Sequence, residues 1–194
     1  QESEQPSSIT VTFFEAGEYP LTEEISTTAP IKFVNAGDID AGDATIVAST
    51  AGMKLGGTRI EFDGVNVKAN DLAVPFITLL SNPYAQTVHG TKTLSDITKL
   101  CFNNLSITGL NKALVKGNGA GNYIKEVEVK NSVIQLEKGA PVTFDFSGAN
   151  GGVTEQFNVV KSTVWAPEAT STSFYSGQSS INAYKEAGIA EQIF

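Results

Sequence analysis

The chain has 194 residues, of which 41% are hydrophobic and only 18% are charged. That hydrophobic content is ample for a packed core, so a globally disordered chain is excluded. The net charge of −8 argues against nucleic acid and against an anionic membrane surface as partners. Because Arg59 is the single arginine and His89 the single histidine, most chemistry that needs an arginine clamp or paired histidines is excluded as well.

The polar opening segment, residues 1–8, is typical of a poorly ordered leader that remains after a targeting segment is removed. We therefore expect a secreted protein or one held at the cell surface, for instance by a lipid anchor. Cys101 is the single cysteine, which rules out an internal disulfide and fits the cytosol equally well. No run of about 18 apolar residues occurs, so we expect no insertion into a membrane.

A short strand pattern recurs along the chain. Two apolar residues separated by one residue are followed by a small or amide residue and a second apolar pair. The copies begin at Ile31, Ile60, Leu100, Val127 and Phe157, which gives steps of 29, 40, 27 and 30 residues. A second apolar series follows the first with a similar period, with steps of 31, 37, 30 and 30 between Ile46, Ile77, Leu114, Phe144 and Phe174.

One repeat is too small to bury its own apolar face, so a period near 30 residues indicates stacked coils with parallel strands. Within a copy, Ile60 and Phe62 are expected to point inward and Glu61 and Asp63 outward. The alternation changes phase at Asp63-Gly64, at Asn103-Asn104 and at Lys130-Asn131. Glycine and asparagine tolerate the left-handed backbone of a sharp corner, and stacked Asn104 and Asn131 amides are expected to bond along the stack.

The alternative architecture is a β-sandwich, whose short strands recur every 8–12 residues. The longer period, and the lack of two-residue Asn-Gly or Asp-Gly hairpins between adjacent strands, favour the coiled parallel form.

These repeated segments resemble the rungs of right-handed parallel β-helices in the pectin-lyase-like superfamily. The opening of the pattern, Phe14 to Leu21 followed by Pro30 to Phe33, is similar to that superfamily's first coil. Among its members the chain most resembles β-helix domains of secreted or surface proteins of gut Bacteroidetes. The resemblance implies an all-β fold: one right-handed parallel β-helix of about five coils.

Three segments follow from this interpretation: a leader over 1–8, a β-helix domain over 9–178, and a C-terminal segment over 179–194. Ser180 is placed to cap a short helix over residues 181–187, which Gly188 would end. The alternative for this segment is the start of a further coil, because residues 189–194 echo residues 153–158. The stretch from Ser81 to Asp96 is the longest one without the repeat, and such insertions often carry function.

Catalytic residues of the superfamily's enzymes, which cleave acidic polysaccharides, are not assembled in the sequence. The expected outward column of Glu61, Cys101, Glu128 and Asn158 places no two carboxylates on adjacent coils, nor does its neighbour, Asp63, Asn103, Lys130 and Val160. No pair of carboxylates that shares a proton is therefore expected.

The best metal candidate is an acidic turn that contains Asp38, Asp40 and Asp43. Calcium prefers several carboxylate oxygens in a flexible turn, yet the glutamate that would complete a calcium loop is absent, since Ser49 stands there. A solvated acidic turn is the plainer interpretation, and no other cofactor is expected.

Exposed aromatic rings suit sugar binding, because pyranose faces stack on them. Trp165 follows the inward Val164 and is expected to point outward, while three tyrosines lie at turns or strand ends. The candidate ligand-binding residues are therefore Trp165, Tyr84, Tyr123 and Tyr175.

The function expected from the sequence is a non-catalytic extracellular β-helix module that binds a polysaccharide or another glycan, or serves a structural role. The first alternative is a divergent polysaccharide-active enzyme of lyase, hydrolase or esterase type, which a lysine or a second carboxylate beside a carboxylate would favour. The second is an adhesin-like assembly segment that self-associates through its coil ends, which a bare apolar end would favour.

Overall fold

The computed structural model describes residues 6–89, 92–117, 121–137, 142–146, 153–166 and 173–176. In these ranges the chain is all β, with 20 strands and no helix. The described residues therefore include no helix long and apolar enough to cross a membrane. The expected helix over residues 181–187 and the leader's first five residues lie outside the described ranges.

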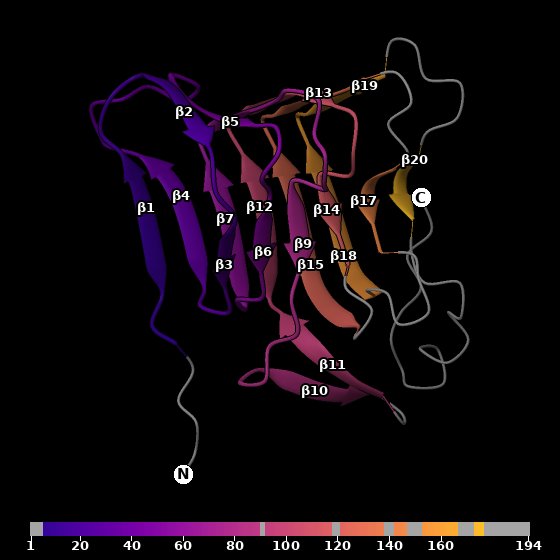
Figure 1. The fold of residues 1–194 in the computed structure, drawn as a ribbon. Coiled ribbons are helices and arrows are strands. Elements are labelled where there is room, and N and C mark those ends of the chain that lie inside the picture. Colours follow the sequence, from indigo (N-terminus) through magenta and orange to yellow (C-terminus); the bar gives the residue numbers. More distant parts are fainter. Residues whose placement is uncertain are drawn as a thin grey trace.

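The strands form three sheets, and the chain passes through them in the same order in each repeat (Figure 1). Sheet A contains β1 (Ile9–Phe13), β4 (Ile31–Asn35), β7 (Arg59–Asp63), β12 (Lys99–Asn103), β15 (Asn122–Lys130) and β18 (Val153–Val160). Sheet B contains β2 (Gly17–Leu21), β5 (Ala44–Ala48), β8 (Asn66–Ala69), β13 (Ser106–Leu110), β16 (Val133–Leu136) and β19 (Thr163–Trp165). Sheet C contains β3 (Ile25–Thr27), β6 (Met53–Leu55), β9 (Ile77–Leu79), β14 (Val115–Lys116), β17 (Val142–Asp145) and β20 (Ser173–Ser176).

All neighbours in this set pair in parallel, which rules out the β-sandwich and is consistent with a β-helix. Within the described residues the chain completes six passes through the three sheets, one more than the expected five, because β1, β2 and β3 form a pass of their own. The aligned residues of sheet A are the expected ones: Ile31, Ile60, Leu100, Val127 and Phe157 follow one another across its strands.

The second expected series is wrong in part, because it joins two sheets. Ile46 lies in sheet B, whereas Ile77 and Phe144 lie in sheet C, where Met53 is the partner of Ile77. Two of its members are also one residue out of register, since Val115 rather than Leu114 pairs with Ile77, and Tyr175 rather than Phe174 pairs with Phe144.

The corners between sheets A and B have the expected left-handed backbone. The φ angles are 76° at Gly64, 56° at Asn104, 50° at Asn131 and 49° at Lys161. Asn131 Nδ2 donates to Asn104 Oδ1 at 3.1 Å, and Asn104 Nδ2 donates to Asp63 Oδ1 at 2.8 Å. The predicted amide ladder is therefore confirmed, with Asp63 as its first acceptor and Lys161 where a further asparagine would fit.

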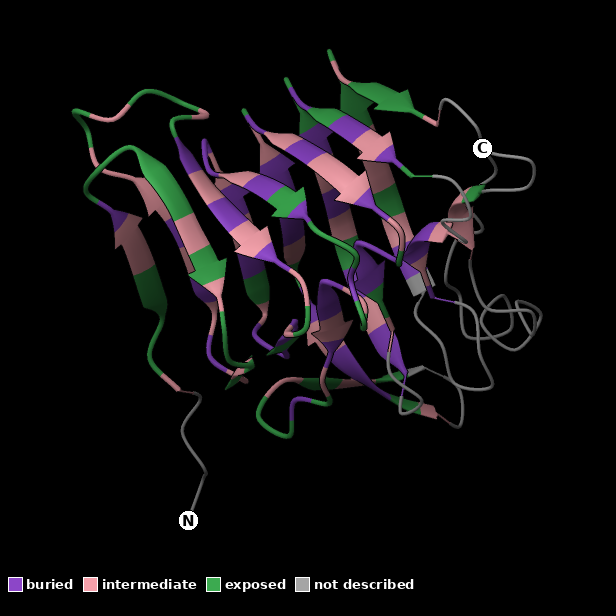
Figure 2. Ribbon diagram, turned by 45° about the horizontal axis from the view of Figure 1, so that its top comes forward, coloured by how far each residue is buried: buried purple, intermediate pink, exposed green. Residues whose placement is uncertain are grey.

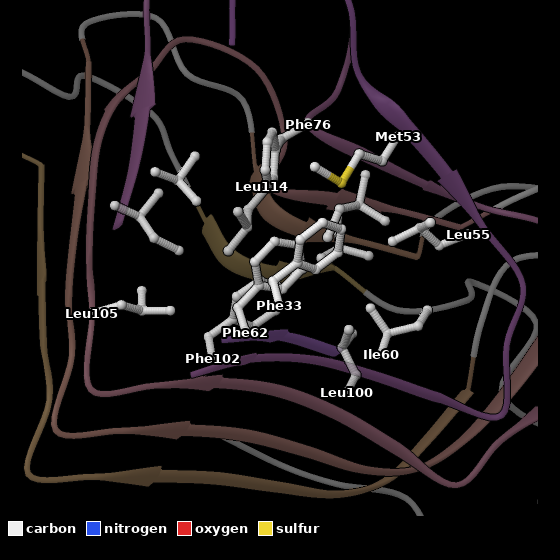
Figure 3. Packing of buried hydrophobic residues seen from close by; sticks show 14 of the residues in the cluster. Phe33, Met53, Leu55, Ile60, Phe62, Phe76, Leu100, Phe102, Leu105 and Leu114 are labelled. Atoms are coloured by element: carbon white, nitrogen blue, oxygen red, sulfur yellow. The ribbon is translucent and has the colours of Figure 1, made fainter. Parts of the chain in front are cut away.

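The core lies between the three sheets and consists of columns of like residues. Buried and solvent-facing positions alternate along the strands, as expected for a sheet with one apolar face (Figure 2). The rings of Phe33, Phe62 and Phe102 stack nearly parallel along the axis, with centroids 4.5 Å and 5.5 Å apart (Figure 3). Stacked aromatic pairs add about 0.5–1.5 kcal/mol each to the free energy gained by burial.

The stretch from Ser81 to Asp96, the longest one without the repeat, adds two strands to the fold. It contains a hairpin of β10 (Gln86–His89) and β11 (Lys92–Ile97), paired antiparallel. The hairpin joins sheet A because β11 also pairs in parallel with the first residues of β15. Asn82 fastens its base, since the buried amide donates to the Gly56 carbonyl oxygen at 2.7 Å.

Candidate functional site

The outer face of sheet A carries several ion pairs between basic side chains and carboxylates. The strand register aligns Lys32, Glu61, Cys101, Glu128 and Asn158 in one row across the sheet. A second row contains Asp63, Asn103, Lys130 and Val160. Both rows match the columns expected from the sequence.

A third row, which the sequence analysis missed, lies one residue before these copies. Arg59 and Lys99 are direct partners in it, and Glu126 pairs with Gln156. The first and third rows together form what we call the charged cluster: Arg59, Glu61, Lys99, Cys101, Glu126 and Glu128. Extending the repeat by one residue towards its N-terminal side would have revealed it.

Lys99 is the centre of the charged cluster. Its Nζ lies 3.4 Å from Glu126 Oε2 and 3.5 Å from Glu128 Oε2. All three side chains are about three-quarters covered, so the ion pairs are partly shielded from water. Such pairs are less weakened by salt than fully exposed ones.

Two asparagines hold the remaining oxygens of these carboxylates. Asn158 Nδ2 donates to Glu126 Oε1 at 3.0 Å, and Asn103 Nδ2 donates to Glu128 Oε1 at 2.7 Å. Each carboxylate thus has one oxygen on the ammonium and the other on an amide. Because these five groups come from three adjacent strands, β12, β15 and β18, the carboxylates are held in fixed positions on the sheet.

The surroundings determine which protons the cluster holds at neutral pH. Burial favours the neutral amine of Lys99, but the nearby acidic groups outweigh it: Cys101 once its thiol ionises, and the carboxylates of Glu126 and Glu128. The Lys99 pKa therefore lies above its ordinary value of 10.5. Burial, reinforced by the carboxylates of Glu61 and Glu128, raises the pKa of Cys101 to about 12. Lys99 is therefore an ammonium and Cys101 a thiol.

Cys101 faces outward, as expected, but the side chains around it leave it almost fully covered. A protonated, buried thiol is neither a nucleophile nor a metal ligand at neutral pH. Its place in the row is that of a small apolar filler between Glu61 and Glu128.

A shallow hollow of about 280 Å³ adjoins the cluster at the start of β1, β4 and β7. Arg59 and Glu61 belong to both, and Arg59 Nε donates to Glu61 Oε1 at 2.7 Å. Lys32 closes the other side, and its Nζ lies 3.7 Å from Asp63 Oδ2. The remaining lining residues are Ser8, Ile9, Thr10, Pro30 and Ile31.

The four aromatic candidates do not form one platform. Trp165 lies on the outer face of sheet B beside Gln135, and 53% of its surface is exposed, as expected. Tyr84 is exposed at the turn before β10. Tyr123 lies on sheet A, and Tyr175 lies on sheet C.

Two of these tyrosines are engaged within the protein. Tyr123 OH donates to Glu155 Oε2 at 2.6 Å, and burial together with this bond raises the Tyr123 pKa to about 12. Tyr175 packs edge-on against Phe146 and Phe157, and burial raises its pKa. Of the four rings, those of Trp165 and Tyr84 are thus the most accessible to a ligand.

The acidic turn lies between β4 and β5, where Asp38, Asp40 and Asp43 are all exposed. The backbone closes the turn, since Asp43 N–H donates to the Asp40 carbonyl oxygen and Asn35 Nδ2 donates to the same oxygen. Across the described ranges, no group of three or more His, Cys, Asp or Glu side chains is placed to hold a metal ion, in this turn or elsewhere.

Comparisons with protein-family models, with curated proteins and with solved structures found no match to this chain.

Proposed function

We propose that the chain winds as a single right-handed parallel β-helix of the pectin-lyase-like kind. The support is the repeated order of sheets A, B and C, with parallel pairing between successive passes. Crossovers between parallel strands of one sheet are right-handed in about 98% of cases, which favours that hand.

We further propose that the protein is a non-catalytic extracellular module that binds a polysaccharide on the outer face of sheet A. One observation carries this proposal: Glu126 and Glu128 are each held by both Lys99 and an asparagine, so ionic and amide groups are preorganised on the outer face of sheet A. Sugar hydroxyls both donate and accept hydrogen bonds, and this face offers partners of both kinds.

The protonation states favour binding over catalysis. A lysine base must lose its proton near neutral pH, whereas the raised pKa of Lys99 keeps it charged. A cysteine nucleophile needs a thiolate, and Cys101 remains a thiol.

The hollow beside Arg59 has a volume of about 280 Å³ and adjoins the charged cluster. It offers a sugar chain a recess at one end of the cluster. Trp165 offers a separate stacking surface on sheet B, where the Gln135 amide lies beside it on the neighbouring strand.

Binding to a panel of soluble polysaccharides, measured by affinity electrophoresis and calorimetry, tests the proposal. We expect Glu128→Gln and Lys99→Met to weaken binding about tenfold or more, because each removes a charge from the row. Glu24→Gln is the matched control, since Glu24 is an exposed carboxylate paired with Lys54 on sheet C. Equal binding by all three variants would reject sheet A as the binding face, and Trp165→Ala then tests sheet B.

A polysaccharide-active enzyme is the second candidate, and one observation favours it: a lysine lies within 3.5 Å of two carboxylates. The same polysaccharides are assayed for new reducing ends and for unsaturated products. We expect neither. Product formation that Lys99→Met abolishes would show that the face is an active site.

A further inference from the structure

The first pass of the chain exposes one whole edge of the fold. In the described residues, β1, β2 and β3 each lie at the end of their sheet, with one side unpaired. Ile9 N–H donates to Pro30 O at 2.7 Å, and Phe13 O accepts from Ala36 N–H at 2.8 Å. Along a strand, the backbone N–H and C=O groups of successive residues point to opposite neighbours. Ile9 and Phe13 bond to β4, so the backbone groups of Thr10 and Thr12 point to the free edge.

This edge is apolar where it faces the core. A hollow of about 180 Å³ opens there, lined mainly by Val11, Phe13, Tyr19, Leu21 and Ile25. The next pass places Phe33, Ile46 and Met53 beneath them, and those three are buried. What the first pass lacks is therefore one more layer of the same kind.

The last described pass lacks a layer on its opposite side. Val159 continues the column of Val129 but is 44% exposed, whereas Val129 is fully buried. Val164 similarly continues the column of Ile134 and is exposed. The described residues place no strand beyond β18, β19 or β20.

The two edges complement each other in shape and register. Both present three parallel strands in the order of sheets A, B and C, at the spacing of about 4.8 Å that relates neighbouring strands. A layer that fits β1, β2 and β3 at once is the β18, β19 and β20 edge of a second copy. The contact is head to tail, so each copy keeps one free end.

Charge distinguishes this arrangement from a head-to-head one. Residues 6–29 contain four glutamates and no basic residue. Glu18 and Glu24 are bonded to Lys68 and Lys54, while Glu15 follows β1 at the corner between sheets A and B. Head-to-head packing would bring two acidic rims together, which is unfavourable.

Lys161 supplies the opposite charge at the other end. It is exposed at the same corner between sheets A and B, in the last position of the asparagine ladder. A coil stacked on β18 therefore places its Glu15 corner over Lys161.

Pro20 limits the contact in sheet B. Gly17 N–H donates to Asp43 O on the β5 side, so the backbone of every second residue from Glu18 onward points to the free edge. Pro20 is one of these residues, and it has no N–H to donate there. Sheets A and C then carry most of the new backbone hydrogen bonds.

We propose that copies of this chain stack head to tail, with the β1–β3 edge of one copy on the β18–β20 edge of the next. The proposal is independent of polysaccharide binding.

Sedimentation velocity of the full chain over a wide concentration range tests this arrangement. We expect an open series of dimers, trimers and longer species that grows with concentration. A single monomeric species at every concentration, or a dimer that never extends, would overturn the proposal.

Variants test the contact itself. Thr12→Pro removes a donor from the free edge of β1 and no hydrogen bond within the fold, and we expect it to abolish the series. Glu15→Lys and Lys161→Glu are each expected to raise the dissociation constant about fivefold, and the double variant to restore it. Lys125→Glu, an exposed charge on β15, is the control that leaves association unchanged.

Circular dichroism and thermal melting establish that each variant is folded. If the two single charge reversals weaken association and the double variant does not recover it, the Glu15–Lys161 contact is absent and the head-to-tail register is wrong.

Discussion

The middle passes and the first and last described passes share one sequence pattern but differ in how far they are buried. Phe62 and Phe102 lie in the middle, with a strand layer on both sides, and neither ring is exposed. Val11 and Val159 occupy equivalent inward columns at the two ends and remain partly exposed. An apolar residue in this fold is therefore stabilised by its neighbours along the stack as much as by its own strand.

The largest effect is expected when a phenylalanine ring of a middle pass is removed. Phe62→Ala is expected to lower the free energy of unfolding by about 3–5 kcal/mol, because the ring stacks between Phe33 and Phe102 and the cavity cannot collapse. Chemical denaturation measures the effect. Phe14→Ala, at a residue that is 72% exposed, is the control and is expected to change the free energy by less than about 0.5 kcal/mol. Similar losses in both variants would contradict the comparison.

A second test uses the close approach of neighbouring passes. A Cβ at Gly57 would overlap the backbone of Ala29 and Pro30, which cannot move aside cheaply. Gly57→Ala is therefore expected to destabilise the protein by about 1–3 kcal/mol in the same denaturation experiment. Gly37 has open space around its Cβ position, so a loss on Gly37→Ala as large as that at Gly57 would show that the spacing is not as described.

The outer face of sheet A gives a pH-dependent prediction. The Cys101 pKa is about 12 in the folded protein and 9.0 ordinarily, so the folded state favours the thiol. The protonated thiol therefore contributes to the free energy of unfolding. This contribution is fully present below pH 9 and is lost as the pH rises from 9 towards 12, by about 1.4 kcal/mol per pH unit.

Denaturation at pH 8, 9, 10 and 11 measures that slope. Cys101→Ala is expected to reduce the loss of stability between pH 9 and 10. Tyr123→Phe is expected to change the pH dependence of stability only above pH 10, where tyrosine in the unfolded chain ionises. A slope that is the same with and without Cys101 would mean that the thiol is not shielded by the cluster.

The smallest expected effect is a gain at the C-terminal end of the asparagine ladder. Lys161 has a φ of 49°, a conformation that asparagine adopts at lower cost. Lys161→Asn also places an amide next to Asn131, and we expect about 0.5–1 kcal/mol of added stability by thermal melting at low protein concentration. Lys125→Asn on the strand β15 removes the same charge without this benefit, and a gain there too would assign the effect to charge alone.

The sequence was most informative where one residue type repeats at one place in each pass. The copies that begin at Ile60, Leu100 and Val127 align without a shift, and the Asn104 and Asn131 corners have the predicted backbone. Alternating apolar residues show which face of a strand is buried, and an asparagine indicates a left-handed corner. Both signals lie within a few neighbouring residues, so they can be recognised in the sequence alone.

The rest depended on contacts between segments. The short strands of sheet C, such as β6 (Met53–Leu55), hold too few residues to show a period, so Ile46 was placed in the wrong series. The charged cluster was missed because Lys99 lies outside the repeated motif and its partners are on another strand. The hairpin that contains Gln86–His89 was missed because its pairing has no counterpart in the other passes.

The stacking of successive passes is the claim on which the binding face, the hollow and both ends depend. Nuclear Overhauser effects between the rings of Phe33, Phe62 and Phe102, in protein labelled only at phenylalanine, measure it directly. With centroids 4.5 Å and 5.5 Å apart, we predict strong cross-peaks between Phe33 and Phe62 and between Phe62 and Phe102. Cross-peaks that instead join Phe62 to strands running antiparallel to it, with none to Phe102, would contradict the stacked arrangement.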